Sequence, residues 1–179
     1  RLGARPGDRV TVQVDKSPQV LWLYLGCLRA GLVYHPLNTA YKTAEVEYFL
    51  KDAEPAIAVC TPDALPLYSS LATAAGMMHV LTLDADGGGT LAAAAAECQD
   101  SFETVARERD DLAALLYSSG TTGRPKGIML SHGNLASNAR TLVKLWEFTA
   151  SDRLLHTLPV FHVHGLFVAT HCVLLRGAS

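Results

Sequence analysis

The chain has 179 residues, of which 49% are hydrophobic and 18% charged, and its net charge is -2. This balance is typical of a globular protein with one substantial core, and it gives no sign of a protein that binds nucleic acid or a membrane surface. No apolar run reaches the roughly 20 residues that a membrane-spanning helix needs.

Strand and helix patterns begin near the amino terminus. Residues 10–14 alternate between valine and polar side chains, which predicts a half-buried strand. Ser17 and Pro18 are typical of a helix start, and apolar residues then recur at helical spacing up to Gly31. A second strand is predicted at residues 32–37.

The same alternation continues over the next fifty residues. We predict a helix that Thr43 caps and Pro55 ends, followed by a buried strand at residues 57–60. A helix at residues 65–75 and a strand at residues 79–83 complete the series. Repeated strand–helix units predict an α/β fold, with a mostly parallel sheet flanked by helices.

The middle of the chain is less informative. Residues 84–89 are rich in glycine and aspartate and predict a flexible loop, and the alanine run at residues 92–96 predicts a weakly specified helix. Residues 107–111 form a charged linker. The apolar run at residues 112–117 then predicts a further strand.

Small polar residues stop this strand abruptly. The segment reads Ser118-Ser119-Gly120-Thr121-Thr122-Gly123-Arg124-Pro125-Lys126. Glycines let backbone amides approach a ligand, hydroxyls add donors, and Arg124 and Lys126 add positive charge, all of which suit phosphate. No Asp or Glu occurs between Asp111 and Glu147. An ordinary surface turn is the alternative, whereas a Walker A loop is excluded because Pro125 stands where it needs glycine.

A helix is predicted after this loop, with Ser131 as its cap and His132 in its first turn. Its apolar face comprises Leu135, Ala139, Leu142, Val143 and Trp146, which we expect to be core. Lying directly behind the loop, the positive end of this helix would favour a bound anion. Residues 154–158 predict a strand, and an apolar helix precedes Gly177.

Two histidines, His162 and His164, follow that strand. At a spacing of two on an extended segment they would point the same way and could hold a metal, but no third ligand lies nearby in the sequence. Satisfied or solvent-facing histidines are therefore favoured over a metal-dependent enzyme.

The segment Tyr117-Ser-Ser-Gly-Thr-Thr-Gly-Arg-Pro-Lys-Gly127 resembles the phosphate-binding signature of the adenylate-forming superfamily, which includes acyl-CoA synthetases. Ser118 stands where that family usually has threonine, and it keeps the hydroxyl. Pro6-Gly-Asp-Arg9, Cys27-Leu-Arg-Ala-Gly31 and Pro36-Leu-Asn38 are similar to framework segments of the family. Residues 158–167 resemble most closely the malonyl-CoA synthetases.

The resemblance implies the large N-terminal domain of an adenylate-forming enzyme, with a βα subdomain at residues 1–110 and a phosphate-loop and acyl-pocket segment at residues 111–179. The implied reaction uses ATP, Mg²⁺ and CoA to convert a small carboxylic acid, malonate or a methyl-substituted malonate, into its CoA thioester. Another short-chain or fatty acid, and a phosphate-binding module without catalysis, remain alternatives.

The resemblance also implies roles for single residues. Lys126, Thr121 and Thr122 are the implied catalytic residues, and the whole segment from Ser118 to Lys126 would hold the ATP phosphates. Ser118 takes the place of a hydroxyl that helps hold Mg²⁺ in some relatives. His162 occupies the place of a histidine that borders the carboxylate substrate, with His164 beside it.

The sequence begins at Arg1 without an initiator methionine and stops where another strand would be expected. We therefore expect a fragment of a longer enzyme whose adenine and ribose segments, Mg²⁺-binding glutamate and mobile C-terminal domain lie beyond Ser179, so that the fragment alone is inactive. Four widely spaced cysteines without a Cys-x-x-Cys pair, and no secretory signal before them, indicate reduced thiols in a cytoplasmic protein.

Overall fold

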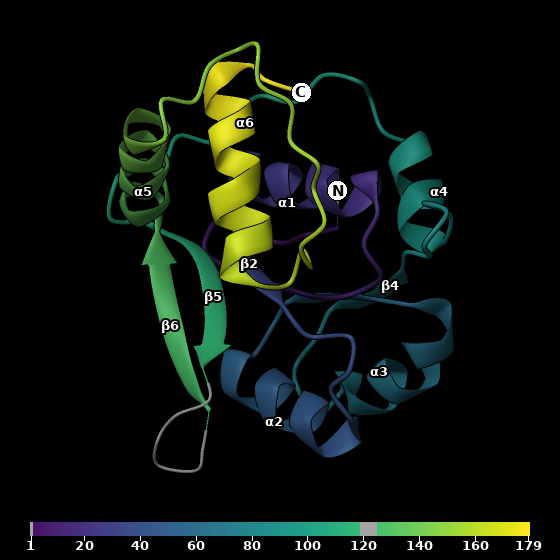
Figure 1. Cartoon of the computed structure of the whole chain (residues 1–179). Helices are drawn as coiled ribbons and strands as arrows, with labels where there is room; N and C mark the ends of the chain where they lie inside the picture. Colours follow the sequence, from purple (N-terminus) through teal and green to yellow (C-terminus); the bar gives the residue numbers. More distant parts are fainter. Residues whose placement is uncertain (1, 119–124) are drawn as a thin grey trace.

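A computed structural model describes residues 2–118 and 125–179 (Figure 1). The strands are β1 (Arg9–Gln13), β2 (Val33–Pro36), β3 (Ile57–Cys60), β4 (His79–Thr82), β5 (Leu112–Ser118) and β6 (Lys126–Ser131). The helices are α1 (Pro18–Arg29), α2 (Thr43–Ala53), α3 (Leu65–Ala72), α4 (Thr90–Ala96), α5 (His132–Leu145) and α6 (Thr170–Arg176). A 3₁₀ turn, η1 (Pro62–Ala64), precedes α3, and a π-helix, η2 (His164–Ala169), leads into α6.

The strands form one sheet in the order β4-β3-β1-β2-β5-β6. β1 pairs in parallel with β2 and β3, β3 with β4, and β2 with β5. Only the β5–β6 pair is antiparallel in the described part of the sheet, and it forms a hairpin. The predicted mostly parallel sheet is confirmed. The predicted segments 1–110 and 111–179 both contribute strands to this sheet, and their division into two units stays a prediction.

Helices cover both faces of the sheet (Figure 1). Because side chains alternate along a strand, Val10 and Val12 join the core under α1, which also includes residues of α5 and η2. The intervening Thr11 and Gln13 lie on the other face, where α2 and α3 pack. Both polar side chains are buried and hydrogen-bonded, Thr11 to His35 and Gln13 to Tyr68.

The helix starts follow the predicted pattern with one change. Ser131 is the N-cap of α5, and its hydroxyl accepts a hydrogen bond from the amide of Asn134. Ser17 precedes α1 and Pro18 begins it, although the Ser17 side chain makes no capping bond. Thr43 is the first residue of α2 and not its cap, because Lys42 has the extended backbone of the N-cap.

Three expectations about the carboxyl-terminal part are wrong. Residues 154–158 form no strand, and Leu155 is 86% exposed. Trp146 is half exposed at the end of α5 and lies outside the core. The start of α5 lies at the end of the hairpin away from Ser118 and Lys126, because the six residues of β6, Ser131 included, extend roughly 17 Å along the sheet.

β6 forms one edge of the sheet. It presents Ile128 and Met129 to the surface, with Met129 66% exposed. Further exposed apolar side chains lie at the ends of α5 and α6, namely Leu145, Trp146, Leu174 and Leu175. Within the described residues, no helix has the length and hydropathy required to span a membrane.

Candidate functional site

The two ends of the predicted phosphate loop are neighbouring strands of one hairpin. β5 ends at Ser118 and β6 begins at Lys126, and the two residues lie opposite each other in the register. Lys126 is exposed, whereas Pro125 and Ser118 are half-buried. Residues 119–124, which include the implied phosphate ligands Thr121 and Thr122, lie outside the described residues. Their roles stay predictions.

A cavity of about 150 Å³ lies beside Ser118, at the carboxyl ends of β2 and β5. Its lining comprises Pro36, Leu37, Asn38, Tyr41, Leu116, Tyr117, Ser118, Ile128, Phe161, His162 and Val163. In open sheets of parallel strands, ligands bind outside these carboxyl ends. We call this lining the strand-end cavity. It brings together two candidates from separate motifs, Ser118 and His162.

His162 and His164 have different surroundings. Both are exposed, and the ring of His162 packs on Phe161 with 4.6 Å between centroids. His164 begins η2 and is not part of the cavity lining. The predicted extended segment is wrong, because the chain turns into a helix at this point. Nor do any three His, Cys, Asp or Glu side chains gather as metal ligands in residues 2–118 and 125–179.

Helix α2 contacts both ends of the loop. The Tyr48 hydroxyl donates a hydrogen bond to the carbonyl oxygen of Pro125 at 3.0 Å. One turn later, Asp52 Oδ2 accepts a hydrogen bond from the Tyr117 hydroxyl at 2.5 Å. Phe49 lies between them in sequence and packs on the Tyr117 ring at 4.6 Å. Burial, and then the bond to Asp52, raises the pKa of Tyr117, which therefore stays a neutral donor.

Beneath Tyr117 lies a fully buried histidine. The His35 ring is 5.4 Å from the Tyr117 ring, and its Nδ1 is 2.8 Å from the Thr11 hydroxyl. Nε2 has no hydrogen-bond partner. Burial lowers the pKa of His35 to about 3, with Arg9 acting in the same direction and Asp52 opposing it. The imidazole is thus neutral at physiological pH and packs against the Tyr117 ring.

The sequence patterns did not point to Tyr48 or Asp52 as part of the site, and they gave Tyr117 only as the first residue of the phosphate signature, without a role. The available signal was weak: Tyr48 and Asp52 are four residues apart, so they lie on the same side of α2. A polar pair next to the buried positions Phe49 and Ala53 indicates a helix edge that faces another element.

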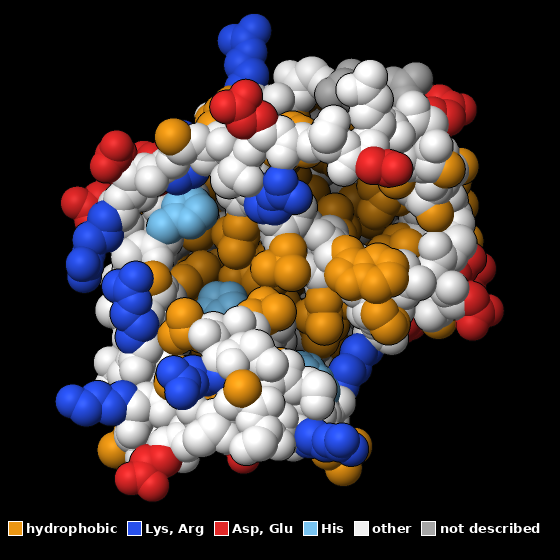
Figure 2. Space-filling view, turned by 90° about the horizontal axis from the view of Figure 1, so that it is seen from above, with side chains coloured by type: hydrophobic (Ala, Val, Ile, Leu, Met, Phe, Trp, Pro, Cys, Tyr) orange, Lys and Arg blue, Asp and Glu red, His pale blue; other side chains and the backbone are white. Residues whose placement is uncertain are grey.

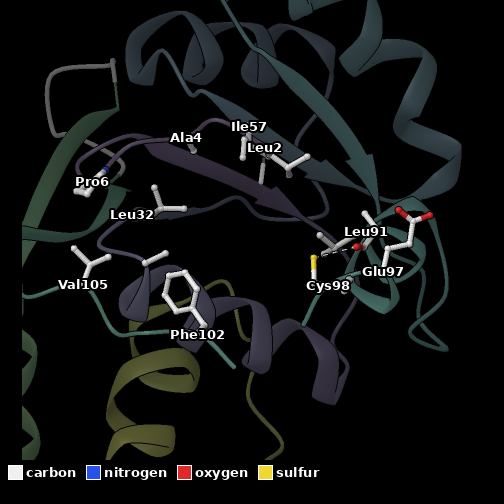
Figure 3. A pocket seen from close by; sticks show the side chains of 13 residues that line it. Leu2, Ala4, Pro6, Leu32, Ile57, Leu91, Glu97, Cys98, Phe102 and Val105 are labelled. Carbon is white, nitrogen blue, oxygen red and sulfur yellow. Dashed lines mark hydrogen bonds between the residues drawn. The ribbon is translucent and has the colours of Figure 1, made fainter. Parts of the chain in front are cut away.

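A second, larger cavity of about 740 Å³ lies at the opposite end of the sheet (Figure 3). It is bounded by the segment before β1, the start of β3, helix α4 and residues 102–105. Figure 3 shows Phe102 on one side, with Leu2 and Ile57 across from it. Figure 2, which views the molecule from above the orientation of Figure 1, shows hydrophobic side chains gathered in a hollow of the surface. We call this cavity the α4 cavity.

The whole chain, residues 1–179, matches the family described as AMP-binding enzymes. Its structure superposes on ATP-bound MatB from Rhodopseudomonas palustris with a TM-score of 0.96 and 52% sequence identity, covering 99% of this chain and 35% of that one.

Curated relatives show the same pattern. An oxalate–CoA ligase of Arabidopsis thaliana is 32% identical over 99% of this chain and 35% of its own length. A malonate–CoA ligase of the same plant is 33% identical over 94% of this chain and 28% of its own length. The chain therefore spans about a third of the length of these relatives. With its parallel sheet and loop hairpin, this chain belongs to the AMP-binding enzyme family.

Proposed function

We propose that the full-length protein containing this chain is an acid–thiol ligase that uses ATP to join a small carboxylic acid to CoA. The observation that carries the proposal is the strand-end cavity, which brings Ser118 of the phosphate segment and His162 within one set of lining residues. Membership of the AMP-binding family, and the likeness to CoA ligases and to an ATP-bound structure, support it.

The proposed reaction has two steps. A carboxylate oxygen of the acid attacks the α-phosphorus of ATP, and the bond to the bridging oxygen breaks, which gives an acyl-adenylate and pyrophosphate. The sulfur of CoA then attacks the acyl carbon, AMP leaves with the bonding electrons, and the thiol proton is released. An oxygen of the carboxylate is a poor leaving group, whereas AMP is a good one. The first step therefore prepares the acyl group for attack by the thiol.

We propose that Lys126 stabilises the leaving pyrophosphate. It is exposed at the start of β6, opposite Ser118 and one residue after the anchored Pro125. Fixed donors and a cation near growing negative charge lower the barrier without reorganisation. We propose that Thr121, Thr122, and the amides of Ser119, Gly120, Gly123 and Arg124 complete this phosphate cradle.

We propose that the hydroxyl of Ser118 is an oxygen ligand of Mg²⁺. Magnesium keeps several waters and takes few protein ligands when phosphates share its coordination, so a single hydroxyl at the edge of the cavity suits it. When bound, the ion would neutralise phosphate charge. Its glutamate ligand is proposed to lie outside this chain.

For the acid, we propose malonate or a methyl-substituted malonate. The cavity is small, about 150 Å³, and His162 offers a polar group at its wall. The similarity to a malonate–CoA ligase and to MatB supports this choice, while the similarity to an oxalate–CoA ligase keeps other short acids as the second candidate. His164, outside the lining, is proposed to assist only indirectly.

ATP–pyrophosphate exchange by the full-length protein tests the proposal. Acetate, oxalate, malonate, methylmalonate and longer acids should be compared at equal concentration, followed by CoA thioester formation with the best acid. We expect exchange to depend on the acid and to be strongest with malonate or methylmalonate. Preference for another acid would correct the substrate. ATP binding without exchange for any acid would favour a binding module and contradict the ligase. Residues 1–179 assayed alone should show no exchange.

A further inference from the structure

One helix fixes both ends of the 118–126 segment to the sheet. The bond from Tyr48 to Pro125 spans 77 positions of the sequence, and the bond from Tyr117 to Asp52 spans 65. Tyr117 is the residue before Ser118, and Pro125 is the residue before Lys126. Ser118 and Lys126, the two residues proposed to contact phosphate, therefore each follow a residue that α2 holds by a hydrogen bond.

The Tyr117 ring strengthens the link between the two ends. Tyr117 and Gly127 are directly opposite in the hairpin, and the ring lies 3.6 Å from the position that a side-chain carbon on Gly127 would take. Residues opposite each other share a face of the sheet, so the Tyr117 ring lies beside the start of β6 at an ordinary van der Waals distance. The Phe49 ring also packs on the Tyr117 ring, with 4.6 Å between the centroids.

Helix α2 is itself firmly placed. Its buried face comprises Val46, Phe49, Leu50 and Ala53. The Arg9 guanidinium of β1 donates hydrogen bonds to the carbonyl oxygens of Ala53 at 2.7 Å and Glu54 at 2.8 Å. These bonds satisfy carbonyls at the helix end and place a cation where the helix dipole favours one. The position of α2 is thereby fixed relative to β1.

We propose that Tyr48 and Asp52 of α2 are positioning residues that hold Ser118 and Lys126 in the geometry for polyphosphate binding. This role rests on the proposed function. Neither side chain lines the strand-end cavity, so each acts through the residue that it binds. A carbonyl held by the Tyr48 hydroxyl fixes the peptide unit that leads into Lys126, which reduces the ordering required when ATP binds.

The test is the variant Tyr48→Phe in the full-length protein, which removes one hydroxyl and keeps the ring. We expect kcat/KM for ATP in pyrophosphate exchange to fall about fivefold, the ratio that one neutral hydrogen bond gives, while KM for the acid changes less than twofold. Tyr117→Phe removes the other bond and should act in the same direction. Tyr24→Phe is the matched control, because it loses a buried tyrosine bond, to His171, on the opposite face of the sheet.

A double-mutant cycle with Lys126→Ala separates positioning from general stability. If Tyr48 acts through Lys126, Tyr48→Phe should lower kcat/KM for ATP less than twofold when lysine is already absent. An equal loss in both backgrounds, or equal effects on ATP and acid, would show a structural role only. Unchanged ATP kinetics in Tyr48→Phe would overturn this inference alone. Wild-type protein without exchange activity would overturn the proposed function, and the role of Tyr48 with it.

Discussion

The two cavities differ in size, position and chemistry. The α4 cavity, of about 740 Å³, is lined mainly by aliphatic side chains near the amino ends of the strands. The strand-end cavity, of about 150 Å³, has Asn38, Ser118 and His162 in its wall. Volume alone would select the α4 cavity, whereas converging polar groups at the carboxyl ends of parallel strands select the strand-end cavity. The comparison teaches that the chemistry of a cavity, and not its volume, identifies the site. Four experiments can test the assignment of the site to the strand-end cavity.

The largest effect is expected from Lys126→Ala in the full-length protein. Loss of a cation beside the leaving pyrophosphate should lower the rate of adenylate formation by about 10²- to 10³-fold, by analogy with the removal of an oxyanion-hole donor. Single-turnover measurement of acyl-adenylate checks this. Lys144→Ala, which removes an exposed lysine from α5, is the control and should keep the wild-type rate. Similar rates for both variants would remove Lys126 from the site.

Gly165→Ala should distort the wall of the strand-end cavity. A side-chain carbon on Gly165 would lie 2.0 Å from the carbonyl oxygen of Pro159, so the segment that carries His162 must shift. We expect a loss of about 2 to 3 kcal/mol in the free energy of unfolding, together with a higher KM for the acid.

Gly26→Ala in α1 is the matched control for this change. Nothing lies within 4 Å of the added carbon, and alanine in a helix should stabilise the protein by about 0.5 to 1 kcal/mol. Chemical denaturation compares the two variants. Equal stability of the two would show that the contact at Pro159 relaxes without cost.

Acid should weaken the support under the strand-end cavity. Because the pKa of His35 is about 3 in the folded protein and near 6.5 in the unfolded chain, the unfolded chain binds more protons between these values. Stability is therefore expected to fall as the pH drops from about 6.5 towards 3, by up to about 1.4 kcal/mol per pH unit.

Denaturation curves across this pH range check the contribution of His35. The variant His35→Gln should flatten the slope. His171, whose pKa burial lowers to about 4, should contribute over a narrower range, so His171→Gln should flatten it less. A slope in His35→Gln equal to that of the wild type would contradict the assignment.

The smallest effect is expected in the α4 cavity. Phe102 is 54% exposed and has the Arg29 guanidinium 5.8 Å from its ring centre. Phe102→Ala should cost less than about 1 kcal/mol of stability and should leave adenylation kinetics unchanged. A KM for acid or ATP that rises more than threefold would show that the α4 cavity takes part in the reaction, and the contrast between the cavities would then fail.

The sequence predicted the fold where each element carries its own signal. The valine alternation of β1, the Ser17 and Pro18 start of α1 and the Ser131 cap of α5 are local patterns, and the structure confirms these elements. Residues 154–158 failed because an apolar run becomes a strand only beside a partner, which a local pattern cannot supply.

The site was predictable only in part. The residues of the phosphate segment and His162 came from motifs, and the structure brings Ser118 and His162 to one cavity. The roles of Tyr48 and Asp52 depend on contacts with residues 77 and 65 positions away, so no local pattern could reveal them. The geometry at His164 was misjudged because the helix that begins there depends on packing of Leu166 and Phe167 into the core.

The exposed border formed by β6 has a practical consequence for handling this polypeptide. An edge strand with Ile128 and Met129 at its surface can pair with the same strand of another copy. Residues 1–179 produced by themselves would then self-associate at high concentration, and a charged side chain in place of Met129 would be the simplest way to keep such preparations dispersed.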